Sequence, residues 1–165
     1  MKFNFQALKA IYLHEMDRFR RTLAQSLLSP VLSTSLYFIV FGSVIGGYVQ
    51  KIDGISYGSY IVPGLLMLTL LTQSISNTSF GIFFPKFNGT IYEILAAPIS
   101  TFEVVLAFVG AGATKTLIVG VMIFITSIFF VDVEVKYPLL MIFLLVLVSF
   151  TFALFGFLIG LMSTN

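Results

Sequence analysis

A long stretch without any charged side chain occupies residues 137–165, YPLLMIFLLVLVSFTFALFGFLIGLMSTN. A helix needs about 20 predominantly apolar residues to cross a bilayer, and residues 138–162 supply more than that. Strands of a membrane barrel would instead alternate apolar and polar residues over about 10 positions, and this stretch does not alternate. It therefore predicts a transmembrane helix at 138–162.

Three further stretches with few charges precede it, at residues 22–50, 54–85 and 104–131. They predict spans near 28–49, 60–82 and 112–131. The third stretch contains Lys115, and a lysine at mid-bilayer costs roughly 2.5–3.5 kcal/mol. We expect Lys115 to lie in the first turn of its span with its ammonium reaching the membrane surface. The alternative is a buried, functional cation within the span.

The composition supports a membrane protein. Of 165 residues, 58% are hydrophobic and 10% are charged, against about 25% charged in an ordinary soluble domain. The absence of cysteine excludes a disulfide-stapled domain and any cysteine-ligated metal. A net charge of +2 is too small and too scattered for a nucleic-acid-binding protein. We find no sequence motif for catalysis or for a metal, and His14 is the only histidine.

Basic residues set the expected orientation. Five lysines and arginines precede the first span, and each later loop has fewer, which predicts a cytoplasmic N-terminus. Within this basic segment an apolar stripe recurs at helical spacing, which indicates an amphipathic helix lying at the cytoplasmic surface. The stripe consists of Leu8, Tyr12, Met16, Phe19 and Leu23, and Glu15 interrupts it. A solvated basic tail is the alternative.

The longest loop, residues 83–103, is then cytoplasmic. Asn88-Gly89 is typical of a turn, and Thr90 with Glu93 has the spacing of a capping box. Together they predict a short helix at 91–97 that ends before Pro98. We interpret this helix as a docking element for a soluble partner, the alternative being a spacer between two spans.

The second predicted span carries a polar stripe. Thr69, Gln73, Ser76 and Asn77 lie three or four residues apart, and Thr72, Ser74, Thr78 and Ser79 widen the stripe. Polar groups in lipid must find partners. They either bond to a neighbouring helix or line a polar path.

Three motifs in order resemble the permeases of ABC-2 type transporters. They are Tyr60-Ile-Val-Pro63-Gly64-Leu65-Leu-Met, Asn88-Gly89-Thr90-Ile-Tyr-Glu93-Ile-Leu-Ala-Ala-Pro98-Ile-Ser100 and Phe155-Gly156-Phe-Leu-Ile-Gly160-Leu-Met-Ser. The resemblance covers essentially the whole chain, as a single transmembrane domain over residues 1–165. Such permeases continue beyond a fourth span, so this chain is expected to be truncated there.

The resemblance implies a fold and a function. The fold is an all-α polytopic membrane protein with four transmembrane helices, an N-terminal interfacial helix and a short cytoplasmic coupling helix. The chain would be the non-catalytic permease subunit of an exporter in the bacterial inner membrane. It would pair as a homodimer and bind a separate ATPase subunit, so that ATP binds to the partner and no cofactor binds to this chain. The implied substrates are polysaccharides, lipo-oligosaccharides or drugs.

Site residues follow from the same resemblance. The expected coupling positions, which dock the ATPase, are Gly89, Thr90, Tyr92, Glu93 and Pro98. Thr69, Gln73, Ser76 and Asn77 are expected at the translocation path or the dimer interface. Two other classes stay open: an ATP-independent channel or assembly protein, which would need no docking helix, and an intramembrane enzyme, which would need acids or histidines within its spans.

Overall fold

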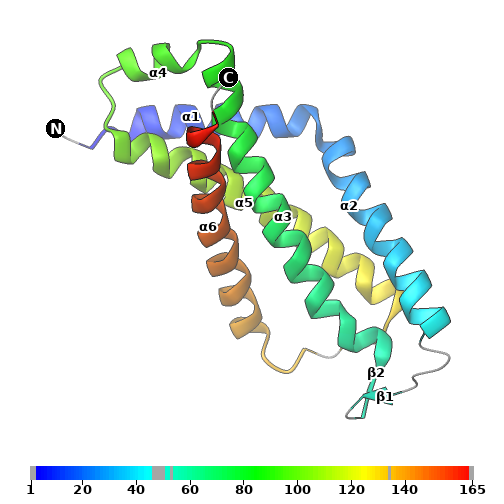
Figure 1. Cartoon of the computed structure of the whole chain (residues 1–165). Coiled ribbons are helices and arrows are strands. Elements are labelled where there is room, and N and C mark those ends of the chain that lie inside the picture. The colour runs from blue at the N-terminus through cyan, green and yellow to red at the C-terminus, as the bar shows by residue number, and fades with distance from the viewer. Residues whose placement is uncertain (1–2, 46–50, 53, 134, 164–165) are drawn as a thin grey trace.

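The structure is a computed structural model that describes residues 3–45, 51–52, 54–133 and 135–163, and almost all of them are helical (Figure 1). The elements in order are α1 (Phe5–Arg21), α2 (Leu23–Tyr37), the π-helix η1 (Phe38–Ile45), β1 (Lys51–Ile52), β2 (Ile55–Ser56), α3 (Tyr57–Phe87), α4 (Ile91–Ala96), α5 (Thr101–Phe130) and α6 (Pro138–Met162). Within these residues four helical segments are long and apolar enough to cross a membrane: Leu23–Phe41, Tyr57–Phe87, Thr101–Phe130 and Pro138–Met162. The predicted all-α polytopic membrane fold is confirmed.

The helix boundaries differ from the predicted ones mainly at the end of the bundle where α1 and α4 lie. The last helix begins at Pro138 and ends at Met162, as expected. In contrast α5 begins at Thr101 rather than near residue 112, because the apolar residues 104–111 continue the helix up to its cap at Ser100. Residues 46–49 of the first predicted span lie outside the described residues.

The connection before α3 contains a two-stranded antiparallel hairpin. Lys51 pairs with Ser56 and Ile52 with Ile55, and Gly54 turns the chain with φ +82°. Gly58 lies in the first turn of α3, where a β-carbon would come within 3.2 Å of Val131. Its role there is to permit close packing of α3 against the end of α5.

Small residues let α3 pack closely against its neighbours in the bundle. A β-carbon on Gly156 of α6 would lie 2.5 Å from the Ile75 carbonyl oxygen of α3, and one on Gly160 would lie 2.7 Å from that of Ser79. Gly112 of α5 meets Thr78 of α3 in the same way. Helices in lipid associate mainly by such close packing and by interhelical hydrogen bonds. The Gly156-x-x-x-Gly160 pattern thus marks the α3–α6 contact.

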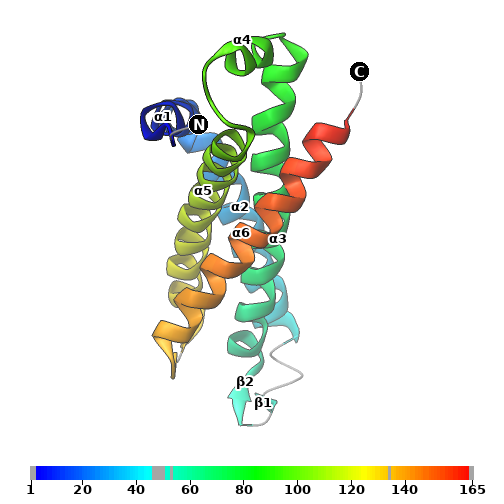
Figure 2. The ribbon, with the colours of Figure 1, turned by 90° about the vertical axis from the view of Figure 1, so that its left-hand side faces the viewer.

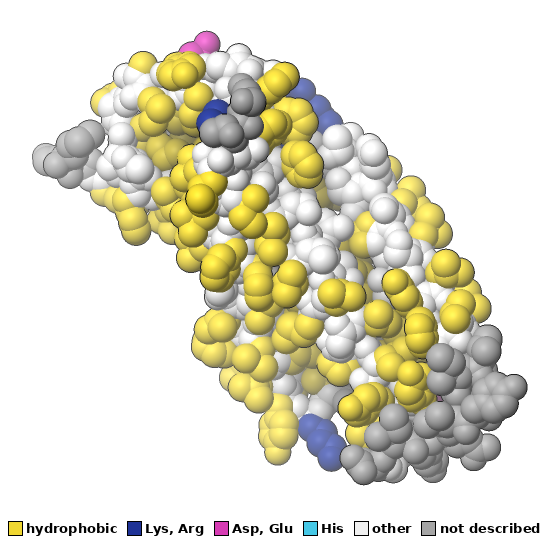
Figure 3. Space-filling model, viewed as in Figure 1, with side chains coloured by type: hydrophobic (Ala, Val, Ile, Leu, Met, Phe, Trp, Pro, Cys, Tyr) yellow, Lys and Arg dark blue, Asp and Glu magenta, His cyan; other side chains and the backbone are white. Residues whose placement is uncertain are grey.

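The core lies where α3, α5 and α6 meet. Its cluster of buried side chains comprises Ile82, Val104, Phe108, Val109, Ala113, Ala153 and Phe157. Outside this core, large apolar side chains are exposed along the bundle, and Figure 3 shows them along the flank with basic side chains toward the two ends. Such an apolar flank suits contact with lipid or with further membrane helices.

Helix α1 runs across the bundle, near the end that carries α4 and the last turn of α6 (Figures 1 and 2). The Asn4 side chain caps its first turn by accepting a hydrogen bond from the Ala7 amide, and the helix ends at Thr22. The predicted apolar stripe faces inward, with Phe19 buried against the bundle. Lys9, Asp17, Arg20 and Arg21 are exposed. These positions fit an amphipathic helix at a membrane surface.

Candidate functional site

Helix α4 sits on the end of the bundle between α3 and α5 (Figure 1). Ile91 and Ile94 pack against the core cluster from one face of α4. On the other side Tyr92 is 73% and Leu95 61% exposed, and Glu93 is also exposed. No residue of α4 is fully buried. The short helix is therefore anchored by one face and presents the other outward.

The turns on both sides of α4 fix its position. Gly89 adopts φ +79°, the left-handed region that favours glycine, and it follows the end of α3 directly. Pro98 is exposed and follows the end of α4. The expected helix at 91–97 is thus present as Ile91–Ala96. Of the five predicted coupling residues, Thr90, Tyr92, Glu93 and Pro98 are exposed and Gly89 is half-buried.

The capping box predicted at Thr90 is wrong. Thr90 already has helical backbone angles, φ −60° and ψ −21°, and its side chain makes no capping hydrogen bond. The capping box lies at the next helix, where the Ser100 hydroxyl accepts from the Glu103 amide and the Glu103 carboxylate accepts from the Ser100 amide. Ser100 and Glu103 have the same capping-box spacing as Thr90 and Glu93, so the sequence pattern alone could have predicted either site.

Glu103 also joins the N-terminal end of the described chain to the start of α5. Its Oε1 accepts a hydrogen bond from the backbone amide of Asn4, and the residue is only 2% exposed. One carboxylate therefore caps α5 and fixes the start of α1 beside it. Sequence reasoning did not predict this contact, because the two residues are 99 positions apart.

Lys115 does not reach the surface as expected. It lies in the middle of α5, is 4% exposed, and donates to Oε2 of Glu15 on α1 at 2.7 Å. Arg18, one turn further along α1, pairs with the same oxygen at 3.1 Å. The reason is that α1 crosses α5 at this level and supplies a carboxylate, so the ammonium finds a partner inside the protein. Glu15, which interrupts the predicted stripe, is 2% exposed and thus more buried than Phe19 of the stripe, which is 6% exposed.

The polar stripe of α3 divides into two faces. Ser74 and Thr78 are buried, and the Ser74 hydroxyl donates to the Ser149 carbonyl of α6 at 2.6 Å. The four predicted path residues lie on the other face: Ser76 is exposed, and Thr69, Gln73 and Asn77 are half-buried. Thr69 donates to Leu65 of its own helix, and Asn77 to Gln73. A hydrogen bond between helices therefore accounts for the polar side chain of Ser74. The four predicted path residues lie outside the buried core.

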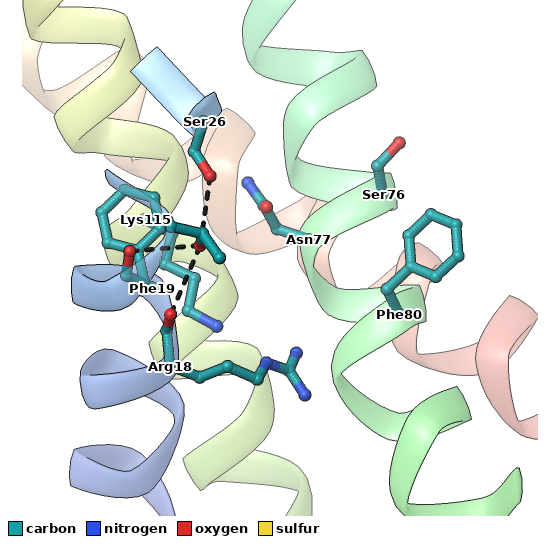
Figure 4. Close-up of a pocket in the computed structure, with 8 residues that line it drawn as sticks. Arg18, Phe19, Ser26, Ser76, Asn77, Phe80 and Lys115 are labelled. Atoms are coloured by element: carbon teal, nitrogen blue, oxygen red, sulfur yellow. Dashed lines mark hydrogen bonds between the residues drawn. The ribbon is translucent and has the colours of Figure 1, made fainter. Parts of the chain in front are cut away.

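A recess of about 120 Å³ opens beside this second face, between α3 and the junction of α1 with α2 (Figure 4). In Figure 4 the charged ends of Lys115 and Arg18, together with the Asn77 amide, point into the space between the helices. The residues lining it are Arg18, Phe19, Thr22, Ser26, Ser76, Asn77, Phe80 and Lys115. Among the residues that the structure describes, no three His, Cys, Asp or Glu side chains gather as a metal site would require.

Comparisons with known proteins agree on one family. Residues 6–165 match the ABC-2 type transporter family. The chain is 38% identical over 157 residues to the inner membrane transport permease YadH of Escherichia coli strain K12, and equally to the protein of that name in Shigella flexneri. The alignment covers 95% of this chain and 61% of each relative.

The chain thus spans about three fifths of the length of the relatives it matches. A search of solved structures finds no match. The family match nevertheless runs through α1, all four membrane helices and the exposed α4 segment. The chain belongs to the ABC-2 type transporter family.

Proposed function

We propose that this chain is the permease subunit of an ATP-binding-cassette exporter, and that α4 docks a separate ATPase subunit. The observation that carries the proposal is the anchored but exposed helix α4, in a chain that belongs to the ABC-2 type transporter family. A helix that served only as a spacer would not need an outward face bearing Tyr92 and Leu95, because exposed apolar side chains of this size typify contact surfaces.

We place the α1 and α4 end in the cytoplasm. Lys9, Arg18, Arg20, Arg21 and Lys86 lie toward that end, whereas Lys51 and Lys136 lie at the other. Cytoplasmic loops carry an excess of lysine and arginine, so this distribution supports a cytoplasmic N-terminus. The membrane would be the bacterial inner membrane, as the printed name of the relatives says of them.

The proposed coupling is mechanical. Ile91 and Ile94 fix α4 to the core, and short connections join it to α3 and to α5. A displacement of α4 would therefore move both α3 and α5. Glu93 adds an exposed carboxylate for a basic partner residue, although exposed ion pairs contribute only about 0–1 kcal/mol. Rigid transmission thus matters more than that one pair.

The transport path is part of the same proposal. Two permease subunits would associate, with Thr69, Gln73, Ser76 and Asn77 facing the path or the dimer interface. Their position away from the core of this chain supports it. The substrates would be polysaccharides, lipo-oligosaccharides or drugs. Nucleotide would bind to the partner subunit, and this chain would do no catalysis.

Variants of α4 test the docking. Glu93→Lys should weaken ATPase binding about two- to fivefold, since it replaces an attractive charge with a repulsive one. Pro98→Gly should lower substrate-stimulated ATP turnover, because it loosens the connection between α4 and α5. Both are measured with the full-length permease reconstituted with its ATPase in proteoliposomes. Asp132→Lys, an exposed acid at the opposite end, is the matched control and should change neither quantity. Turnover unchanged in both α4 variants would argue for an ATP-independent channel or assembly protein.

Thiol labelling tests the orientation. The 165 residues contain no cysteine, and Tyr92 and Tyr137 are 73% and 72% exposed at opposite ends of the bundle. A maleimide that cannot cross membranes should label Tyr137→Cys in spheroplasts, and Tyr92→Cys only after permeabilisation. The reverse pattern would place α4 outside the cell and remove the basis for ATPase docking.

A further inference from the structure

We propose that the recess between α3 and the α1–α2 junction binds the phosphate group of an anionic membrane lipid. This inference depends on the membrane placement of the helices and not on ATPase docking. The site combines two cations, neutral hydrogen-bond donors and an opening beside Ser76 and Asn77 of α3. None of these features is used by the coupling segment at α4.

Charge provides the first argument. Lys115 and Arg18 both pair with one oxygen of Glu15, so the described cluster holds two positive charges and one negative charge. A charge in a membrane-embedded site needs a partner, because desolvation is costly without one. The nearest further acid on α1, Asp17, is exposed on a different face of the helix. The cluster is thus one negative charge short of neutral.

Free donors provide the second argument. A lysine ammonium has three N–H groups and an arginine guanidinium has five, and the described contacts with Glu15 use one N–H of Lys115 and one nitrogen of Arg18. Among the described residues, the side chain of Asn77 donates only a long hydrogen bond of 3.5 Å to Gln73, and that of Ser26 one of the same length to Thr22. These groups line the recess (Figure 4). Phosphate oxygens are strong acceptors for such a set of donors.

The position of α1 provides the third argument. Its exposed side carries Lys9, Asp17, Arg20 and Arg21, which favours a position of this helix at the membrane surface. The recess lies directly beside the end of α1, where α2 begins its apolar run. That is the level of the lipid headgroups, where phosphates are concentrated.

Gly81 of α3 lies beside the cluster. A β-carbon there would lie 3.4 Å from Oε2 of Glu15 and 4.0 Å from Nη2 of Arg18. The Arg18 guanidinium also lies 5.9 Å from the centre of the Phe84 ring, also on α3. Arg18 is therefore held between α1 and α3 while about a third of its side chain stays exposed. A lipid phosphate would reach the cluster through this arginine.

Native mass spectrometry of the purified full-length protein tests the proposal, with dioleoyl phosphatidylglycerol added in detergent. Arg18→Gln should weaken retention of the lipid about tenfold, since one charge-assisted contact is lost. Arg20→Gln removes the same charge from the exposed face of α1 and should leave retention unchanged. Arg18→Lys keeps the charge and should retain most of the lipid binding. This variant shows whether the loss in Arg18→Gln comes from the missing charge or from a general loss of folding.

Three results would overturn the proposal. Equal loss in Arg18→Gln and Arg20→Gln would show general attraction to a basic surface rather than a site. Equal retention of dioleoylglycerol, which lacks phosphate, would show apolar binding only. Ready displacement of the lipid by inorganic phosphate would assign the recess to a soluble or substrate-borne phosphate instead of a membrane lipid.

Discussion

Glu15→Ala should destabilise the protein by about 3–5 kcal/mol, because it leaves the Lys115 ammonium buried without its partner. Lys115 is 4% exposed and its contact with Glu15 measures 2.7 Å. The same carboxylate also holds Arg18, so the loss removes the electrostatic link between α1 and α5. The expected readout is a lower midpoint of thermal unfolding in detergent, followed by the loss of the monodisperse peak in size-exclusion chromatography.

Two controls separate the ion pair from other effects. Asp17→Ala removes an exposed acid from the same helix and should change stability by less than about 0.5 kcal/mol. The double variant Glu15→Leu with Lys115→Met replaces the pair by apolar side chains and should recover most of the lost stability. If Glu15→Ala were as stable as Asp17→Ala, the buried pair would not hold α1 in place.

Gly156→Ala should destabilise the α3–α6 contact by about 1–3 kcal/mol or more. The new β-carbon would lie 2.5 Å from the carbonyl oxygen and 2.8 Å from the α-carbon of Ile75, and backbone atoms cannot rotate away as side chains do. Helix α6 would have to move outward, which would also strain the Ser74–Ser149 hydrogen bond. The measurement is again the thermal unfolding midpoint in detergent.

Gly64→Ala is the matched control for this substitution. Gly64 also lies in a membrane helix, but a β-carbon there would meet nothing within 4 Å. Alanine favours a helix over glycine by roughly 0.8–1 kcal/mol. Gly64→Ala should therefore be neutral or slightly stabilising. Equal midpoints for Gly156→Ala and Gly64→Ala would contradict the close approach of α3 and α6.

The number of membrane helices was predictable because it depends on where charges are absent. The apolar run at 138–162 gave both ends of α6 correctly. Where charge and helix coincide, the same criterion was wrong. It placed the start of α5 near residue 112, so that Lys115 would lie in the first turn, whereas the helix begins at Thr101 and continues through Lys115. Hydropathy locates the part of a helix that enters lipid, whereas capping residues locate where the helix begins.

In the candidate sites, features set by neighbouring residues were predictable from the sequence, and contacts between residues far apart in the sequence were not. The short helix α4 was predictable from Gly89 and Pro98, since turns and helix ends are encoded locally. The Glu15–Lys115 pair was not, because the partners are 100 residues apart and only the crossing of α1 over α5 joins them. Lys115 alone therefore suggested a surface cation. The two faces of the polar stripe on α3 likewise became distinguishable only once α5 and α6 covered Thr78 and Ser74.

The most direct test of the proposed permease is site-specific cross-linking of α4 to the ATPase. The full-length protein with Tyr92→Cys would be co-expressed with the ATPase subunit and treated with a short thiol-to-amine cross-linker, followed by intact-mass analysis. Tyr137→Cys, equally exposed at the opposite end, is the control. We expect a permease–ATPase product from Tyr92→Cys and none from Tyr137→Cys. A product from Tyr137→Cys alone, or from neither while the two proteins still co-purify, would contradict docking on α4.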